Sequence, residues 1–113
     1  MFSSRIWASR RDGRPAARPV VVVTAQLVLD QHPSGVHIVP LTSTIRGYRS
    51  EVTIEPDPGN GLETVSAAQC QHSRAIAVER LAAPIGNVGP QALTQMREIL
   101  ADLLDLWRFA RQS

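Results

Sequence analysis

The stretch PVVVVT, residues 19–24, is the strongest indication of the fold, because it is an unbroken apolar run rich in β-branched side chains. Such a run is typical of a strand that is buried on both faces. A second run of this kind, GVHIVPLTS at 35–43, begins at Gly35 after the turn signal HPSG. The two runs therefore predict two core strands.

Shorter elements follow these two runs. Residues 50–56, SEVTIEP, alternate apolar and polar side chains, as in a strand with one exposed face. A loop is predicted for 56–61, PDPGNG, from its turn residues. Further along, the sequence predicts a fourth strand at 64–71, one helical turn at 77–83 and a short last strand at 84–88.

The C-terminal part predicts one amphipathic helix over residues 89–110. Gly89 and Pro90 stand at its start, where proline suits the first turn. Apolar side chains then recur at steps of three and four residues: Leu93, Met96, Ile99, Leu100, Leu103, Leu106 and Trp107. Short strands followed by one helix predict a single domain, 1–113, that is mainly β: a small, mostly antiparallel barrel covered by the helix. The apolar stripe is also compatible with a share in a dimer interface.

The composition suits a globular domain and argues against several other classes of protein. The chain has 113 residues, 43% of them apolar and 19% charged, as in one compact core rather than a disordered segment. No apolar run reaches the ~18 residues of a membrane-spanning helix, and the N-terminus lacks the apolar segment of a signal peptide. The single cysteine, Cys70, suits a reducing, cytoplasmic location and is expected in the core rather than as a nucleophile. No metal or cofactor is expected, because Cys, His and acidic residues do not cluster at ligand spacing.

All twelve basic residues are arginines, although the net charge is only +2. Five of them fall within the first eighteen positions: Arg5, Arg10, Arg11, Arg14 and Arg18. Guanidinium groups suit bidentate binding of phosphate. A high genomic GC content would also favour arginine, so composition alone does not indicate nucleic-acid binding.

The second apolar run ends in a polar segment. In VPLTSTIRG, residues 39–47, three hydroxyl side chains follow Leu41, and Arg46 stands two residues beyond them. Taken alone, a Thr-Ser pair at a strand end is typical of a hydrogen-bonded turn.

The order of these segments resembles the MazF/PemK (Kid) family of bacterial toxins. The matching pieces are ARPVVVVT, VHIVPLTST, a strand, a GL loop, VSAAQCQHSRAIAVERL, PIGNV and the final helix, over about residues 5–107. The resemblance implies an SH3-like (CcdB/PemK-like) β-barrel, a homodimer, and the toxin component of a type II toxin–antitoxin system. Such toxins cut single-stranded RNA at short motifs without a metal. The RNA's own 2′-hydroxyl attacks, which leaves a 2′,3′-cyclic phosphate and a 5′-hydroxyl, and a cognate antitoxin covers the RNA groove.

The resemblance makes Arg18, Thr42 and Ser43 the candidate catalytic residues. Arg18 matches the family's catalytic arginine in the RPV motif, and its guanidinium can hold two phosphoryl oxygens at once. Arginine is a poor proton donor, so an electrostatic role is the stronger expectation. Thr42 and Ser43 match the family's P-x-T-S pattern, and their hydroxyls can orient the attack.

The segment QCQHSR, residues 69–74, departs from the Kid branch, in which an arginine and an aspartate flank the cysteine as acid and base. Gln69 and Gln71 take their places, and an amide does not accept a proton at pH 7. His72 is the nearby side chain of a type that titrates near neutrality, and it is the candidate for proton transfer. A surface or interface histidine is the commoner finding. Arg74 matches the family's Q-x-R pattern and is expected to bind RNA phosphate or to support the structure.

The N-terminal part departs from the family as well. Residues 4–7, SRIW, resemble a shortened form of the family's first strand. Only ten residues separate Trp7 from Arg18, fewer than in the family's usual first loop. The expectation for 1–17 is a shortened, arginine-rich strand and loop that leaves the groove more open and attracts phosphates. The residues expected to bind RNA are Arg14, Thr44, Arg46, Arg49, Gln69, Gln71 and Arg74.

Two other functions fit the sequence. A CcdB-like toxin shares the barrel but acts without catalysis, by binding DNA gyrase through its C-terminal helix, and does not need the pair Arg18 and Thr42. A degenerate homologue would bind an antitoxin but lack activity, which Gln69 and Gln71 would explain.

Overall fold

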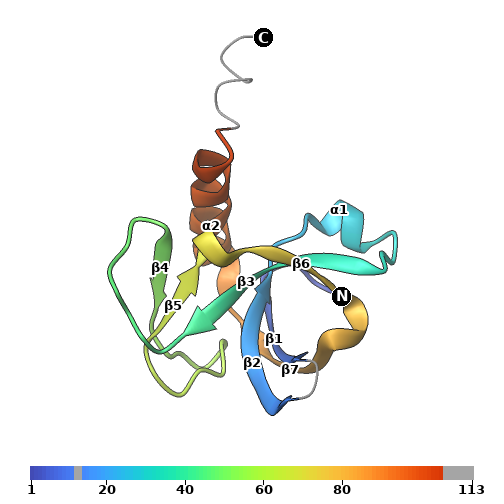
Figure 1. Cartoon of the computed structure of the whole chain (residues 1–113), viewed down its shortest axis with the longest axis horizontal. Coiled ribbons are helices and arrows are strands. Elements are labelled where there is room, and N and C mark those ends of the chain that lie inside the picture. Colours follow the sequence, from blue (N-terminus) through green and yellow to red (C-terminus); the bar gives the residue numbers. More distant parts are fainter. Residues whose placement is uncertain (12–13, 106–113) are drawn as a thin grey trace.

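The computed structural model describes residues 1–11 and 14–105, for residues 11 and 14–17 through the backbone only. In chain order the elements are β1 (Arg5–Arg11), β2 (Arg14–Val22), α1 (Gln26–Leu29), β3 (Gly35–Thr42), β4 (Glu51–Ile54), β5 (Ser66–Gln69), η1 (Cys70–His72), β6 (Arg74–Ala77), η2 (Val78–Arg80), β7 (Leu81–Asn87) and α2 (Gly89–Leu103). Figure 1 shows the strands wrapped into a curved sheet, with α2 packed on one side of it.

The strands form one antiparallel sheet in the order β4-β5-β3-β2-β1-β7, and β6 also pairs with β3. β3 is the long central strand. Its first half pairs with β6 through Ile38 and Arg74, and its last residues pair with β5 through Leu41 and Ala68. Among the described residues, β4 and β7 at the two ends of this order do not pair, so the sheet is barrel-like but not closed. The predicted mainly β, antiparallel fold with a C-terminal helix is confirmed.

The valine run is buried on both faces of the sheet, as predicted. Val20 and Val22 belong to one apolar cluster, whereas Val21 and Val23 belong to a second cluster that includes Met96 of α2. Successive side chains of a strand point to opposite faces. The run therefore joins two cores, and each buried valine contributes roughly 1.5–3 kcal/mol to stability.

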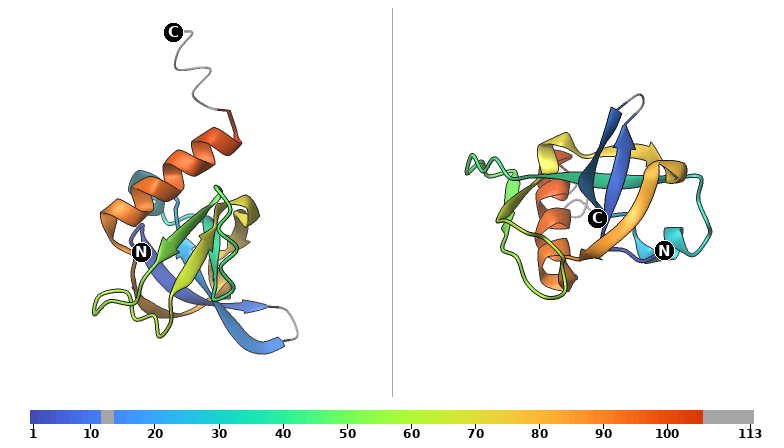
Figure 2. Two further views of the ribbon diagram at one scale, coloured as in Figure 1. Left: turned by 90° about the vertical axis from the view of Figure 1, so that its left-hand side faces the viewer. Right: turned by 90° about the horizontal axis from the view of Figure 1, so that it is seen from below.

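The N-terminal segment forms a two-stranded ribbon rather than a short strand and a loop. β1 continues past Trp7 to Arg11, and β2 already begins at Arg14. The two strands pair antiparallel, with Ser9 opposite Arg18. Figure 2 shows the ribbon projecting from the body of the sheet. The ten residues before Arg18 are thus strand for the most part, because cross-strand pairing satisfies their backbone groups.

Helix α2 is shorter than the sequence predicted. It begins where the Asn87 side-chain oxygen accepts a hydrogen bond from the Gly89 N–H at 2.8 Å. The helix ends at Leu103, and Asp105 takes the left-handed conformation, with φ of 56°. Beyond Leu100 the helix has passed the sheet, so its apolar side chains lose the packing that stabilises earlier turns. The remainder of the predicted helix, 106–110, lies outside the described residues, and no described helix is long and apolar enough to cross a membrane.

The segment around Cys70 is more broken than the predicted strand 64–71. β5 ends at Gln69, a short 3-10 helix covers Cys70–His72, and β6 follows as a strand that the sequence did not predict. Cys70 is buried and its thiol lies 3.9 Å from the Met96 carbonyl oxygen, so the turn is held against α2. The predicted helical turn at 77–83 is represented by the 3-10 helix Val78–Arg80 alone.

The loop between β4 and β5 is anchored by a buried asparagine. The Asn60 side chain donates to the Glu55 carbonyl oxygen at 2.8 Å and accepts from the Leu62 N–H at 3.0 Å. The backbone of Asn60 also lies so close to Gly86 of β7 that a Cβ there would stand 2.3 Å from the Asn60 carbonyl oxygen. These contacts set the position of residues 61–64 beside Arg18.

Candidate functional site

Two adjoining grooves share Arg18. The first groove has a volume of about 550 Å³ and is lined by Ser9, Arg18, Val20, Pro40, Gln69, Gln71, His72, Ser73 and Arg74. The second groove has a volume of about 540 Å³ and is lined by Arg18, Pro19, Leu41, Thr42, Ser43, Gly61, Leu62, Glu63, Thr64, Ser66 and Ile85. The structure thus brings the predicted catalytic residues and the predicted 69–74 segment to one place, with Arg18 between them.

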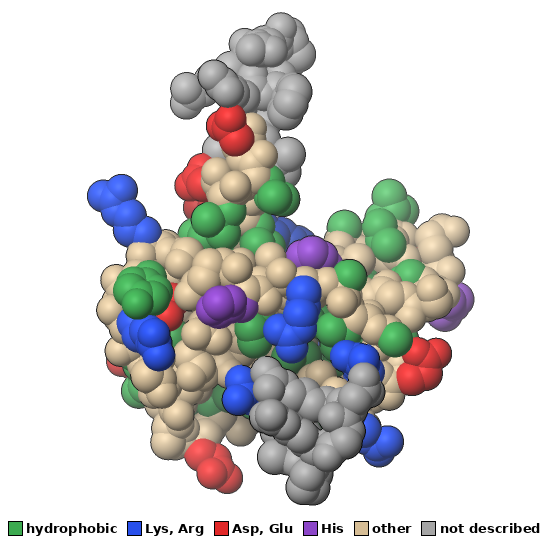
Figure 3. Space-filling view, viewed as in Figure 1, with side chains coloured by type: hydrophobic (Ala, Val, Ile, Leu, Met, Phe, Trp, Pro, Cys, Tyr) green, Lys and Arg blue, Asp and Glu red, His purple; other side chains and the backbone are tan. Residues whose placement is uncertain are grey.

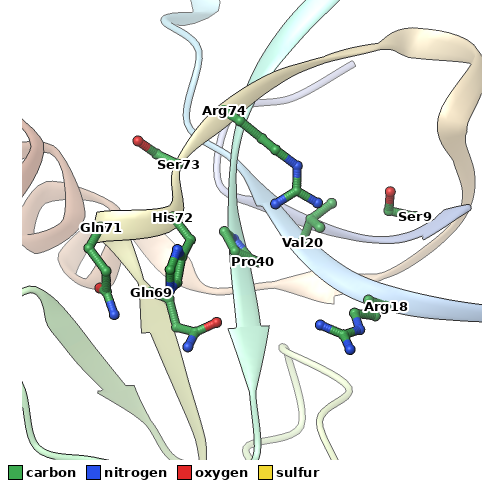
Figure 4. A pocket seen from close by; sticks show the side chains of 9 residues that line it. All are labelled: Ser9, Arg18, Val20, Pro40, Gln69, Gln71, His72, Ser73 and Arg74. Atoms are coloured by element: carbon green, nitrogen blue, oxygen red, sulfur yellow. The ribbon is translucent and has the colours of Figure 1, made fainter. Parts of the chain in front are cut away.

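The floor of the first groove is apolar and its cations converge above it. Val20 and Pro40 come from the paired strands β2 and β3, where they stand opposite each other. Figure 4 shows the guanidinium groups of Arg18 and Arg74 pointing into the groove, with Val20 between them. Two guanidinium groups over an apolar floor suit an anion with several oxygens, because each can donate two parallel hydrogen bonds.

The 3-10 turn after β5 brings further polar groups to this groove. Gln69 and His72 lie side by side and face the space below Pro40, whereas Gln71 lies at the margin farthest from Arg18 (Figure 4). The Gln71 side-chain oxygen is buried, and no described residue donates to it. Ser73 points away from the groove and its N–H donates to the Cys70 carbonyl oxygen at 3.1 Å, which closes the turn. His72 is therefore at the groove, where the sequence hypothesis required it.

The second groove holds the hydroxyl pair at the end of β3. Thr42 accepts a hydrogen bond at its Oγ1 from the Thr44 N–H at 3.1 Å, as the turn interpretation predicted. That bond uses the oxygen as an acceptor and leaves its hydrogen free to be donated to a ligand. Thr42 and Ser43 both line the second groove, and the turn holds the chain in place there.

Three other predicted RNA-binding residues, whose side chains the structure describes, lie outside both grooves. Thr44, Arg46 and Arg49 are exposed in the connection between β3 and β4. Figure 3 shows arginine and histidine side chains distributed over this face of the molecule, from that connection across the centre of the sheet. Arg14 begins β2, four residues before Arg18, and its side chain is outside the described part of the structure.

Sequence reasoning missed Ser9 as a groove residue. Ser9 is buried and stands opposite Arg18 in the β1–β2 register, and it lines the first groove. The dipeptide Asp12-Gly13 is a hairpin signal that would have predicted this pairing. Glu63 and Thr64 were missed as well, because only the packing of the 55–62 loop on β7 brings them to the second groove.

Cys70 is a core residue, as predicted, and burial raises the pKa of its thiol to about 11. The group therefore stays protonated at neutral pH and is a poor nucleophile. Among residues 1–11 and 14–105, His, Cys, Asp and Glu do not form a group of three or more that could hold a metal ion.

We expect Cys70 in the folded protein to react with iodoacetamide at pH 8 about a hundredfold more slowly than in urea, because a pKa raised from 9.0 to about 11 lowers the thiolate fraction by that factor. Mass spectrometry of the alkylated protein measures both rates. Equal rates in buffer and in urea would contradict the core position.

The grooves are found in a chain that matches a known toxin family over almost its full length. The model of the PemK-like, MazF-like toxins of type II toxin–antitoxin systems matches residues 6–104. Endoribonuclease MazF9 of Mycobacterium tuberculosis (strain ATCC 25618 / H37Rv) is 39% identical over 95 residues, which cover 80% of this chain and 80% of that protein. Endoribonuclease MazF3 of Mycobacterium tuberculosis (strain CDC 1551 / Oshkosh) is 32% identical over 90 residues, or 80% of this chain and 84% of that protein.

Solved structures share the fold. The Mycobacterium tuberculosis toxin MazF-mt6 superimposes with a TM-score of 0.75 at 29% identity, covering 89% of this chain and 96% of that one. An endoribonuclease from a mycobacterial species, solved in complex with its cognate antitoxin, has a TM-score of 0.77 at 21% identity, covering 94% and 96% of the two chains. The chain described here belongs to the family of PemK-like, MazF-like toxins of type II toxin–antitoxin systems.

Proposed function

We propose that this protein is the toxin of a type II toxin–antitoxin system and acts as a metal-independent, sequence-specific endoribonuclease on single-stranded RNA. Family membership and relatives named as endoribonucleases support the class of activity. The observation that carries the proposal is the position of Arg18, which lines both grooves. A phosphodiester bound at Arg18 would have the Thr42 and Ser43 hydroxyls on one side and His72 on the other.

The reaction proposed is an internal transesterification. The RNA 2′-oxygen forms a bond to the neighbouring phosphorus, the bond from phosphorus to the 5′-oxygen breaks, and the products are a 2′,3′-cyclic phosphate and a 5′-hydroxyl. Negative charge grows on the phosphoryl oxygens in the transition state. Arg18 stabilises that charge, and Arg74, which points into the same groove, adds a second guanidinium. Hydrogen bonds from Thr42 and Ser43 hold the phosphate in line with the 2′-oxygen.

Proton transfer is the part of the chemistry that the glutamines cannot perform. The attacking 2′-hydroxyl loses a proton and the departing 5′-oxygen gains one. We assign one of these transfers to His72, since it lines the first groove with Arg18 and belongs to a residue type that changes its charge near neutral pH. Gln69 and Gln71 instead hydrogen-bond the RNA, because an amide both donates and accepts.

We expect His72→Ala to slow RNA cleavage at pH 7 by on the order of tenfold or more, because one proton transfer loses its side chain. The measurement is the initial rate of cleavage of one labelled RNA at pH 7. His32→Asn is the matched control, because His32 is exposed in the turn before β3 and lines neither groove. A folded His72→Ala protein that cuts the RNA at the wild-type rate would remove His72 from the proton transfer.

The remaining predicted residues are proposed to bind the RNA backbone outside the scissile phosphate. Arg46 and Arg49 are exposed beyond the grooves, and Thr44 precedes them in the chain, directly after the hydroxyl pair. Arg14 begins β2 in the projecting ribbon. Backbone contacts of this kind bind without reading sequence and weaken as salt rises.

The test of the proposed function is incubation of the purified protein with a long single-stranded RNA in EDTA, followed by sequencing of the new 5′ ends. Discrete cut sites that disappear in both Arg18→Ala and Thr42→Ala support it. Intact RNA under all conditions would refute it. Inhibition of gyrase by the same preparation would then favour a CcdB-like toxin. Binding of an antitoxin, without RNA cleavage or gyrase inhibition, would favour a degenerate homologue.

Assembly and location follow from the same proposal. Leu103 and Leu104, at the end of α2, are 51% and 66% exposed and extend the apolar stripe of the helix beyond the sheet. We assign this surface to a second copy of the chain, so that the toxin is a homodimer, and we expect a cognate antitoxin as its other protein partner. Its RNA substrate and its single unpaired cysteine suit the bacterial cytoplasm.

A further inference from the structure

The connection between β3 and β4 displays an aromatic ring between two arginines. Tyr48 is the single tyrosine of the chain, and its side chain is 52% exposed. Arg46 and Arg49 stand on either side of it and are exposed as well. Aromatic rings interleaved with cations are typical of surfaces that bind single-stranded nucleic acid, because the rings stack on bases while the cations contact phosphates.

The backbone that carries this ring is held by one carboxylate. The Glu51 Oε1 atom accepts hydrogen bonds from the Arg46 N–H at 3.2 Å and from the Gly47 N–H at 3.1 Å. The Glu51 N–H donates in turn to the Tyr48 carbonyl oxygen at 3.0 Å. Gly47 takes a φ of 73° between these contacts, a conformation that glycine adopts without strain. The ring is thus presented from an ordered turn, which reduces the entropy lost when a ligand binds it.

The same connection adjoins both grooves. It leaves β3 directly after Thr42 and Ser43, which line the second groove. It returns to the sheet at Glu51, which stands opposite Gln69, a residue of the first groove. The Ser50 carbonyl oxygen also accepts from the Cys70 N–H at 3.0 Å, so the end of the connection is bonded to the turn that carries His72. Both ends of the connection, which Figure 1 shows running from β3 to β4, therefore adjoin the two grooves that share Arg18.

From these observations we infer that Tyr48 is a base-stacking site for an unpaired nucleotide next to the scissile phosphate. The ring stacks on the face of that base, Arg46 and Arg49 contact the flanking phosphates, and Glu51 is a positioning residue that holds the turn. Every base offers a π-face, so the site increases affinity for single-stranded RNA without itself selecting a sequence. The inference rests on the proposed ribonuclease function and adds to it a binding contact outside both grooves.

The test uses a short RNA that contains a mapped cut site, made uncleavable by a 2′-deoxy substitution at the attacking nucleotide. Each base near the cut is replaced in turn by an abasic sugar, and the affinity of wild type and variants is measured by fluorescence anisotropy. We expect Tyr48→Leu to bind the intact RNA about tenfold more weakly, and Tyr48→Phe, which keeps the ring, to bind within twofold of wild type. Ile45→Ala is the control, since it removes another exposed apolar side chain of the same connection.

The decisive result is whether the loss of affinity caused by an abasic position depends on the presence of the Tyr48 ring. One abasic position should cost wild type about tenfold and cost Tyr48→Leu little, because the partner of that base is already absent. Equal losses in both proteins at every position would overturn the inference, as would wild-type affinity in Tyr48→Leu. A change in self-association or antitoxin binding with RNA affinity preserved would make Tyr48 a protein contact instead. Each of these outcomes would overturn the stacking site while RNA cleavage that depends on Arg18 remains. A wild-type protein that cuts no RNA would instead refute the proposed ribonuclease function, and the stacking site with it.

Discussion

Replacing Arg18 with alanine is expected to lower the rate constant of RNA cleavage by roughly 10²–10³-fold, the range seen when one preorganised donor to a transition-state oxyanion is removed. Arg18 lines both grooves, so its loss removes the group that connects the hydroxyl pair to the His72 side. The measurement is a single-turnover rate on a labelled RNA with saturating protein, which separates the chemical step from binding.

Two control variants make this result specific. Arg18→Lys keeps the positive charge but loses the bidentate geometry, and we expect a rate between those of wild type and Arg18→Ala. Arg5→Ala removes an arginine of the neighbouring strand whose guanidinium lies 5.3 Å from the centre of the Phe2 ring, outside both grooves, and should leave the rate unchanged. A folded Arg18→Ala protein that cuts RNA at the wild-type rate would contradict the assignment.

Replacing Gly86 with alanine is expected to lower the free energy of unfolding by about 2–3 kcal/mol, because the added methyl group overpacks a close backbone contact. The Cβ would stand 2.3 Å from the Asn60 carbonyl oxygen and 2.4 Å from its carbonyl carbon, and backbone atoms cannot turn aside as a flexible side chain does. Either β7 or the 55–62 loop must move. The melting temperature should fall by roughly 10 °C, and the displaced loop should also lower the rate of RNA cleavage.

Gly35→Ala is the matched control for that variant. Gly35 is also a strand glycine without a left-handed φ, but its added Cβ would meet only the Ile76 carbonyl oxygen, at 3.4 Å. We expect the free energy of unfolding of Gly35→Ala to differ from that of wild type by no more than about 0.5–1 kcal/mol. Differential scanning calorimetry of both variants gives the comparison. Equal melting temperatures for Gly86→Ala and Gly35→Ala would show that the contact with Asn60 does not constrain the loop.

The core strands could be predicted because their signal is local. Four consecutive valines at 20–23 have few alternatives to a strand buried on both faces, and the structure places alternate valines in two different clusters. The end of α2 could not be predicted in the same way. The apolar stripe continues through Leu106, but a helix of this kind depends on a surface to pack against, and the sheet ends before Leu103.

The site was predictable only in part for a similar reason. Arg18 and Thr42 belong to short motifs at the ends of the two predicted core strands, so pairing of those strands already places them near each other, although Arg18 lies within the longer β2. The meeting of His72 with Arg18 depends on the 3-10 turn at Cys70–His72, which the burial of Cys70 against α2 holds in place. Ser9 reaches the groove only through the pairing of β1 with β2, and β1 was predicted to be four residues long. Long-range packing decides these positions, and no short segment encodes it.

The most direct test of the central claim is cleavage of an RNA whose attacking 2′-hydroxyl is replaced by hydrogen at one mapped cut site. The assay contains EDTA and leaves a second, unmodified cut site in the same molecule as an internal control. If the RNA supplies its own nucleophile at Arg18, cleavage should stop at the modified site and continue at the other, with a 2′,3′-cyclic phosphate on the upstream fragment. Cleavage at the 2′-deoxy position at the rate of the unmodified site would contradict that mechanism.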